Sequence, residues 1–561
     1  MLILTIWDTL IGILAFVFVL GTIILVHEGG HFYFASKAGI LCREYAFGMG
    51  PLLFGKKKGE TLYAIRALPI GGFCAIAGEE SEEDPLKDKE QVRLLIEDGV
   101  VKKICFEVDC PLFKDMPLYR LKDYDLLDKE QTGKLFISVY EEDEIKTFNV
   151  DPKAHYVYLN KVNYNPELDE EQLKKKYINE FQIAPYNRQM NSKTLWQRTL
   201  VVFGGPLTNI ILAFLVFVIS FMNTGTSNIK STELSEVYEG TAAYEAGLRD
   251  GDVLYKLEAQ GSNGLISNEL KKWDDISVFM DQYKADSKAE MIKISYYEDG
   301  DKNKAKEVEL TPIVFIYSIS MYQDINSDEV KIAPLAEASK AYKGGLREGD
   351  IILSVKGNNV SSWKDVYNEF AKIEEGNQEV VVKVSRMNKE TNTNEEVDCT
   401  VVPYSKELFA KTQNVDYVDV QIGISPVMTR NIFTVIGASF KEMGTSFVQL
   451  LRTLGMLFTS KEIGLKDMSG VIGIFSMTSD AAKGGFANLL YWMGFLSINV
   501  GIMNLLPIPA LDGGRLLFFA YEAIFKKPVP QKIQDKAINI TMILLLALML
   551  YVAVFDVLRL F

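Results

Sequence analysis

The chain has 561 residues, of which 48% are apolar, and it carries a formal net charge of −14 at pH 7. This acidic balance argues against nucleic acid as a partner, because phosphate backbones are bound by basic surfaces. The apolar residues gather in long stretches at 10–35, 200–222, 486–508 and 538–561. Each stretch is close to the roughly 20 residues that a helix needs to cross a bilayer, so we predict a polytopic α-helical membrane protein with about four transmembrane helices.

The first predicted span, at 1–36, contains a His-Glu-Gly-Gly-His motif. On a helix, His27 and His31 lie one turn apart on the same face, so both imidazoles can bind one metal ion. Glu28 then lies beside the ion, where it can accept a proton from a water on the metal. A chance motif in a chain with three histidines has odds of about one in a thousand. A polar cluster without chemistry is the weaker alternative, because charged groups in a lipid-facing helix cost about 2.5–3.5 kcal/mol each.

Lysines and arginines flank the predicted spans unevenly. They follow the first span, precede the second and separate the third from the fourth. By the positive-inside rule, these loops are predicted to be cytoplasmic. Both termini and the region 223–430 are then predicted to lie outside the cytoplasm.

Glycines interrupt short apolar runs at 37–80, a pattern typical of strands and turns. We predict a membrane-associated β-hairpin in this region, with an edge that can hold an extended peptide by strand addition. An ordinary connecting loop is the alternative. The polar and highly charged stretch at 81–192 is predicted to be a cytoplasmic α+β insertion.

Histidine and cysteine residues in these loops offer little sign of a second metal site. His155 has no ligand-like neighbours in the sequence and is predicted to be a surface histidine. Four of the five cysteines fall between residues 42 and 110, where a reducing cytoplasm keeps thiols free. They lack Cys-x-x-Cys spacing, so we interpret them as structural, with Cys105 and Cys110 as a weak candidate metal pair.

The second span, at 193–223, contains a Gly-Gly-Pro sequence at 204–206. Small residues allow two helices to approach closely. Asn209, a polar residue inside the same span, is expected to hydrogen-bond a neighbouring segment. Both features predict helix packing at this point.

An internal repeat follows the second span. The segment 247–254 recurs at 345–352, so we predict two similar domains in tandem, at 224–325 and 326–428. The pattern Ala-x-x-Ala-Gly-Leu-x-x-Gly-Asp at 243–252 resembles PDZ domains, which hold an extended peptide against a sheet edge. Structural spacers are the alternative.

Three further segments complete the predicted chain. The stretch 429–483 is predicted to form amphipathic helices at the membrane surface. The third span lies within 484–526, and the fourth is predicted at 535–561.

A catalytic zinc ion normally has three protein ligands and one open position. The third ligand is predicted to be Asp512, which lies in an apolar segment beside glycines and prolines that interrupt the helix. Asp8, Glu522 and the cysteines at the membrane edge are weaker alternatives. Asn504 is a candidate to donate its amide to a developing oxyanion, with a helix-packing hydrogen bond as the alternative.

Three motifs together resemble the site-2 protease family of intramembrane zinc metalloproteases. They are His-Glu-x-x-His at 27–31, Gly-Pro-x-x-Asn at 205–209 and Asn-x-x-Pro-x-Pro-x-Leu-Asp-Gly at 504–513. The tandem PDZ-like domains make the chain most similar to the RseP-type bacterial members. The insertion is not covered by the resemblance. Two further departures are Arg515, where such proteins often carry histidine, and Val471, where proline is common.

The resemblance implies a zinc metalloendopeptidase of the bacterial plasma membrane that cuts single-span membrane proteins, such as an anti-sigma factor or leftover signal peptides. One zinc ion would be held by His27, His31 and Asp512, with Glu28 and Asn504 as catalytic residues. Peptide segments would bind the PDZ-like domains. The alternatives are an inactive membrane scaffold of the same fold, a metal transporter, and a membrane-tethered protease whose zinc helix lies in a soluble domain.

Overall fold

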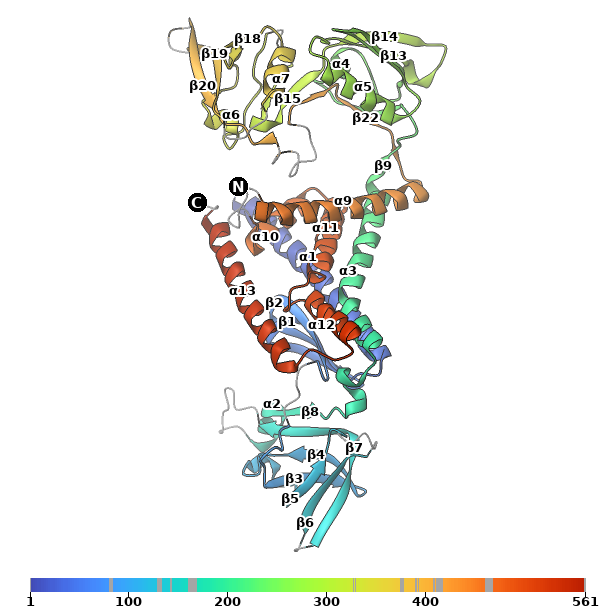
Figure 1. Cartoon of the computed structure of the whole chain (residues 1–561), viewed down its shortest axis with the longest axis vertical. Helices are drawn as coiled ribbons and strands as arrows, with labels where there is room; N and C mark the ends of the chain where they lie inside the picture. The colour runs from blue at the N-terminus through green and yellow to red at the C-terminus, as the bar shows by residue number, and fades with distance from the viewer. Residues whose placement is uncertain are drawn as a thin grey trace. The chain divides into compact units, whose positions relative to one another are not determined.

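The computed structural model describes the chain except for residues 1, 80–83, 129–133, 142–143, 160–168, 326, 328, 374–377, 389–390, 392, 407–408, 410–416, 460–467 and 559–561. The chain forms two compact units, and the boundary between them falls within one long helix. The first unit comprises the residues up to Val216 together with Ser469–Phe561, and the second is Phe217–Met468. Figure 1 shows the elements of both units.

Among the described residues, four helices are long and apolar enough to cross a membrane, as the sequence predicts. They are α1 (Leu2–Lys37), α3 (Leu195–Thr224), α11 (Phe486–Asn504) and α13 (Gln531–Leu558). The apolar faces of α1, α3 and α11 form a common core around Val19, Ile23, Val216 and Met493. Long apolar runs form helices in a bilayer because a helix pairs every backbone N–H and C=O group within the segment. The hydrocarbon core contains no water that could bond these groups instead.

The helix α13 is held differently from the other long helices. Its buried residues are Val552 and Asp556. The Asp556 carboxylate accepts hydrogen bonds from the backbone N–H groups of Gly470, at 2.9 Å, and Gly473, at 3.1 Å. These two glycines lie at the start of α10 (Val471–Lys483), which packs against α1. A carboxylate at a helix N-terminus satisfies N–H groups that have no partner within the helix.

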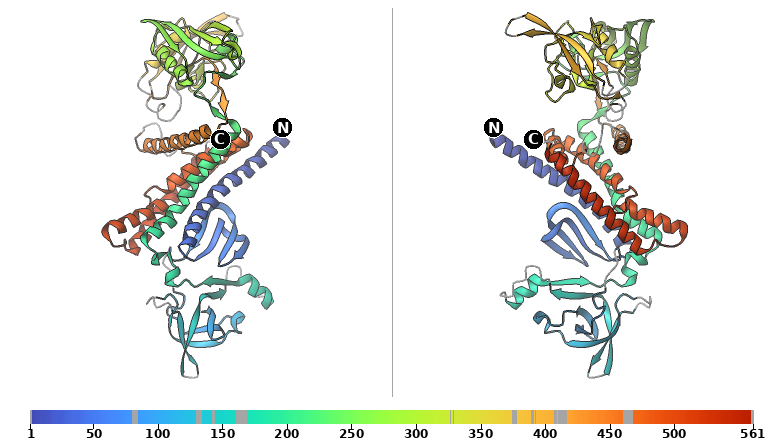
Figure 2. Two further views of the ribbon diagram at one scale, coloured as in Figure 1. Left: turned by 90° about the vertical axis from the view of Figure 1, so that its right-hand side faces the viewer. Right: turned by 60° about the vertical axis from the view of Figure 1, so that its left-hand side comes forward.

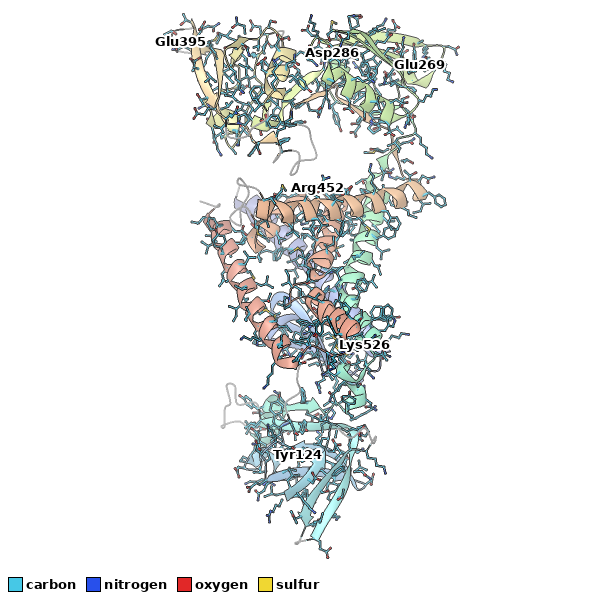
Figure 3. All side chains as sticks on the ribbon, in the orientation of Figure 1. Tyr124, Glu269, Asp286, Glu395, Arg452 and Lys526 are labelled. Atoms are coloured by element: carbon cyan, nitrogen blue, oxygen red, sulfur yellow. The ribbon has the colours of Figure 1, made fainter. Side chains whose placement is uncertain are left out.

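The predicted third-span region consists of two helices, in agreement with the predicted interruption by glycines and prolines. Helix α11 ends at Asn504, and α12 (Asp512–Phe525) begins after a turn that contains Pro507 and Pro509. Proline has no N–H to donate, so the helix stops before them. A Cβ atom on Gly513 would lie 2.2 Å from the carbonyl oxygen of Leu506, so the turn is too tight for a side chain there. Lys526, labelled in Figure 3, follows the end of α12, and its backbone is in the left-handed conformation with φ of 58°.

A β-hairpin packs against α1, as Figure 2 shows. Its strands are β1 (Cys42–Lys58) and β2 (Thr61–Ile76). Residues 44–47 pair on one side with 62–65 and on the other with 72–75. No strand in the described part of the chain pairs with the outer side of 72–76, which is therefore an open edge. The structure confirms a hairpin here and not an irregular loop.

The insertion folds around its own hydrophobic core, which includes Leu94, Ile104, Ile137 and Val139. Six strands follow the order β4-β3-β5-β6-β7-β8, and an additional parallel pairing of β4 with β7 closes five of them into a ring. The strands are β3 (Gln91–Glu97), β4 (Val100–Cys105), β5 (Leu118–Asp125), β6 (Phe136–Glu141), β7 (Glu144–Leu159) and β8 (Ile178–Gln182), with one helix, α2 (Glu170–Tyr177). This content agrees with the predicted α+β fold.

The second unit contains two modules with the same strand order. The first sheet is β12-β11-β13-β14 and the second is β18-β17-β19-β20. The repeated motif plays the same part in both, because the carboxylates of Asp252 and Asp350 accept hydrogen bonds from the backbone N–H groups of Arg249 and Arg347, at 2.9 and 2.8 Å. The first module contains β11 (Val253–Gly261), β12 (Gly264–Glu269), α5 (Trp273–Ala285), β13 (Ile292–Tyr297) and β14 (Ala305–Leu310); the second contains β17 (Ile351–Val355), β18 (Asn358–Asn359), α7 (Trp363–Ala371), β19 (Val380–Asn388) and β20 (Thr393–Val401).

Short elements connect the modules of this unit. After the second module, β21 and β22 return to pair with β15 and β10, which come before it in the chain. The amphipathic helix α9 (Ile432–Thr459) follows. The remaining elements are β9 (Thr226–Ser227), β10 (Leu234–Val237), α4 (Ala242–Glu245), β15 (Ile313–Ile316), β16 (Met321–Tyr322), α6 (Lys340–Lys343), β21 (Asp419–Gln421), β22 (Ile424–Pro426) and β23 (Met428–Thr429).

Candidate metal centre

Helices α1 and α3 touch backbone to backbone beside the histidine motif. A Cβ atom on Gly30 would lie 2.1 Å from the carbonyl oxygen of Gly204, and one on Gly204 would lie 2.7 Å from the carbonyl oxygen of Gly30. Only glycine allows so close an approach. Thr208 reinforces the contact, because its hydroxyl donates to the carbonyl oxygen of Val26 at 2.8 Å.

Three side-chain atoms converge at this contact. The Nε2 atoms of His27 and His31 are 3.3 Å apart, and Oδ2 of Asp512 lies 3.2 Å from the first and 3.5 Å from the second. Asp512 is placed there by the first turn of α12. Within the described part of the chain, these residues are the one group of three or more histidine, cysteine or acidic side chains close enough to hold an ion.

The donor set fits zinc in chemistry and in spacing. Tetrahedral ligands at the usual zinc distances lie about 3.3 Å from one another, which matches the separations above. Among the residues that the structure describes, Oδ2 of Asp512 is buried and has no hydrogen-bond partner. A buried carboxylate oxygen without a partner is costly, and a cation between it and the two imidazoles removes that cost.

Hydrogen bonds behind the histidines orient their rings. Nδ1 of His31 donates to the carbonyl oxygen of Val201 at 2.9 Å, which leaves the Nε2 lone pair directed at the metal position. The fully buried amide of Asn209 lies 3.2 Å from Nδ1 of His27. The atom placed there is the amide nitrogen Nδ2, and among the described residues the amide oxygen has no hydrogen-bond partner. With the amide flipped, the oxygen accepts a hydrogen bond from Nδ1 of His27, so that His27 also directs its Nε2 lone pair at the metal position.

These orienting contacts go beyond the sequence prediction. The sequence predicts a hydrogen bond from Asn209 to a neighbouring segment, but not that the partner is His27. Val201 contributes a backbone carbonyl, and every residue type has one, so the sequence does not predict this contact.

We expect Asn209→Ala to weaken zinc binding by about 10–100-fold, the usual effect of losing an outer contact to a ligand. Zinc retention during titration with a chelator measures this. The control is Asn488→Ala, because Asn488 in α11 donates to the carbonyl oxygen of Gly484 in its own chain segment, at 2.9 Å, and does not line the catalytic cavity. Unchanged zinc affinity in Asn209→Ala would limit Asn209 to helix packing.

Gly205 leaves room for both imidazoles. A Cβ atom at this position would lie 2.3 Å from Nε2 of His31 and 2.8 Å from Cε1 of His27. We therefore expect Gly205→Ala to displace the rings and remove most of the bound zinc, measured by metal analysis of the purified protein. Gly437→Ala in α9 is the control, because a Cβ atom there meets nothing within 4 Å. Equal zinc content in both variants would contradict this account.

A cavity of about 850 Å³ opens on the three converging side chains and is also lined by Glu28 and Asn504. The structure thus brings all the predicted site residues to one place. Glu28 lies beside Gly72 of β2, because a Cβ atom on Gly72 would lie 3.3 Å from its Cγ atom. Asn504 is the last residue of α11.

Among the described residues, none of the alternative ligands belongs to the group of side chains that lie close enough to hold one ion. Glu522 forms an ion pair with Arg198 at 2.6 Å. Of the cysteines at the membrane edge, Cys42 and Cys74 are buried. Cys74 lines the cavity, but neither thiol is in the group of described side chains that lie close enough to hold one ion. The weak candidate Cys105 contacts the backbone of Glu107, and His155 lies 3.4 Å from Nζ of Lys57. The side chain of Asp8 lies outside the described residues. Arg515, which departs from the family pattern, forms an ion pair with Glu79 at the edge of the cavity.

The fold and the site define a membrane-embedded metallopeptidase. Its metal position lies between α1, α3 and α12 of the first unit. Comparison with known proteins agrees. The chain matches Peptidase family M50 over residues 15–548 and belongs to this family.

Relatives align over almost the whole chain. The zinc metalloprotease RasP of Bacillus licheniformis is 29% identical over 553 residues, covering 98% of this chain and 99% of the relative. The regulator of sigma-W protease RasP of Bacillus subtilis is 29% identical over 555 residues, with the same coverage. The zinc metalloprotease RasP of Geobacillus kaustophilus is 29% identical over 556 residues, covering 99% of both. The chain is accordingly an intramembrane zinc metalloprotease.

Proposed function

We propose that His27, His31 and Asp512 hold a single zinc ion and that Glu28 is the general base of peptide hydrolysis. The observation that carries this proposal is the convergence of three ligand atoms within 3.2–3.5 Å of one another, in a cavity that Glu28 also lines. Zinc, when bound, supplies Lewis acidity that lowers the pKa of water toward neutrality. Glu28 accepts the proton of the attacking water and returns it to the leaving amine.

Asn504 supports the reaction from the end of α11. Its side-chain amide can donate to the oxygen of the peptide carbonyl as negative charge develops there. Such a donor acts more strongly in a site that excludes bulk water.

The substrates in this proposal are single-span membrane proteins, cut within or beside their transmembrane segments. A helical substrate keeps its carbonyl groups in internal hydrogen bonds, so the segment must unwind before it is cut. The open edge at 72–76 lines the catalytic cavity and offers backbone hydrogen bonds to the unwound strand. The name of the Bacillus subtilis relative supports regulated proteolysis, of an anti-sigma factor for example, and leftover signal peptides are a second substrate class.

The proposed setting is a bacterial cell membrane. The positive residues in the loops favour a cytoplasmic insertion at 81–192 and extracytoplasmic termini and modules. The modules at 224–325 and 326–428 act as PDZ-like domains that bind peptide segments or exclude partners with bulky outer domains. An inactive scaffold with peptide-binding modules is the alternative.

The test is cleavage of a single-span substrate by the purified full-length protein in lipid nanodiscs, with the cut site mapped by mass spectrometry. We expect a cut inside or next to the apolar segment that disappears with a zinc chelator. A cut far outside that segment would favour a tethered protease with a soluble-type site. Absence of zinc-dependent cleavage would favour the scaffold.

A further inference from the structure

The catalytic cavity is not lined by the membrane helices and the hairpin alone. It extends to the insertion, which contributes the side chains of Phe106, Tyr156, Tyr158 and Phe181. A volume of about 850 Å³ is within the range of sites that enclose a ligand of several side chains. The metal position and these aromatic rings therefore belong to one continuous space.

Three of the rings are presented by neighbouring strands. Tyr156 in β7 pairs with Phe181 in β8, and Tyr158 lies two residues further along β7. Residues directly opposite each other, and residues two apart on one strand, share a face of a sheet. Phe106 supports them, because its ring stacks on Tyr158 with centroids 6.1 Å apart and meets Tyr156 edge-on at 6.4 Å.

Two of the four rings, those of Tyr158 and Phe181, are not part of the hydrophobic core of the insertion. Tyr156 belongs to that core and Phe106 packs against it, but Tyr158 and Phe181 are outside the core clusters of the insertion's described residues. Phe181 is 39% exposed. The guanidinium of Arg43 in β1 lies 3.9 Å from the Phe181 ring centroid, which holds the ring toward the hairpin.

Part-buried polar contacts fix the insertion to the hairpin, so the rings have a defined position. Arg188 forms two hydrogen bonds with the carboxylate of Glu60, at 2.7 and 2.8 Å, and Gln182 donates to the same carboxylate at 2.7 Å. The hydrogen bonds from Arg188, helped by Gln182, lower the pKa of Glu60 to about 2, so this carboxylate stays ionised at neutral pH. Arg43 donates to the carbonyl oxygen of Gln182 at 3.0 Å.

We propose that Phe106, Tyr156, Tyr158 and Phe181 form an aromatic subsite of the protease, which binds a large apolar side chain of the substrate close to the cleaved bond. The inference rests on the proposed function, because its occupant is the substrate strand. A strand added to the edge at 72–76 lies in the same cavity as the rings. Flat, rigid aromatic surfaces bind apolar side chains with little loss of conformational entropy.

The first test measures selectivity. Full-length protein in nanodiscs cuts single-span substrates in which each residue flanking the cut is Leu, Phe or Ala in turn. We expect wild type to prefer Leu or Phe over Ala at one position on the insertion's side of the cut. In the double variant Tyr158→Ala with Phe181→Ala, kcat/KM for the preferred substrate falls about 10–100-fold and the preference disappears, because a lost apolar contact in a pocket has an effect of this size.

The matched control is Tyr119→Ala. Tyr119 is also in the insertion and contacts another ring, Phe148, at 6.2 Å, but it does not line the cavity. This variant should retain the preference, and all variants should retain their zinc. A double variant that keeps the wild-type preference overturns the aromatic subsite. Milder Leu substitutions at 158 and 181 test the same preference if the alanine variant fails to fold.

A second measurement does not depend on cleavage. A photocrosslinking p-benzoylphenylalanine replaces Tyr158 in Glu28→Gln protein, and in a control it replaces Tyr119. We expect a covalent adduct with the substrate from position 158 only. Adducts with lipid alone, or from both positions equally, overturn the subsite. Failure of the proposed function gives a different result: wild type would not cut the substrate, or Glu28→Gln would cut it equally well. The adduct would still report whether the substrate occupies the subsite.

Discussion

Glu28→Gln is expected to abolish proteolysis while the protein keeps its zinc. The amide has almost the same shape as the carboxylate but cannot accept the proton of the attacking water. Glu28 lines the cavity but is not in the group of side chains close enough to hold the ion. We expect cleavage to fall by at least about 10²–10⁴-fold, the usual contribution of a general base, measured as the initial rate of substrate cutting.

Glu28→Asp provides the matched comparison for this variant. It keeps a carboxylate on a side chain one methylene shorter, so it should restore part of the activity. Zinc content should equal that of wild type in both variants. Equal rates for wild type and Glu28→Gln would disprove the role of Glu28 as the base.

Asp512→Asn is expected to lose zinc and activity together. A neutral amide oxygen is a weaker ligand than a carboxylate, and the loss of the negative charge leaves the two imidazoles as the remaining donors. Losing an outer contact alone weakens metal binding by about 10–100-fold, so losing the ligand itself should have a larger effect. Metal analysis of the purified variant, with chelator titration, measures this loss.

Glu522→Gln is the control for Asp512→Asn. Both carboxylates lie in α12, but Glu522 pairs with Arg198 and not with the histidines. This variant should keep its zinc. An excess of zinc in the assay should restore part of the activity of Asp512→Asn and none of that of Glu28→Gln. Full zinc occupancy in Asp512→Asn would show that another side chain is the third ligand.

The local patterns in the sequence predicted much of the chain. Long apolar runs predicted four membrane-spanning helices, because helix length and bilayer thickness are linked by a fixed rise per residue. The alternation of glycines and short apolar runs predicted the hairpin at 42–76. The repeat of one motif predicted two modules, which share the same strand order.

Other features could not be read from local patterns. The prolines and glycines predicted an interrupted helix in the third-span region, but not the bounds of α11 and α12 or the close approach of Gly513 to Leu506. The orienting partner of His31 is a backbone carbonyl, which any residue could provide. The contribution of the insertion to the catalytic cavity depends on how β7 and β8 face the hairpin.

The residues that can carry the chemistry are identifiable from the amino-acid sequence, because two histidines and a glutamate at helical spacing in an apolar segment have few other uses. Asp512 is identifiable as well, because acidic residues are rare in such a segment. That these groups meet at one point is visible only in the folded chain. His31 and Asp512 are separated by most of the chain, and their distance of 3.5 Å depends on the glycine contact between α1 and α3 and on the turn that begins α12. Such distances arise from packing between remote segments, which residue spacing along one helix does not specify.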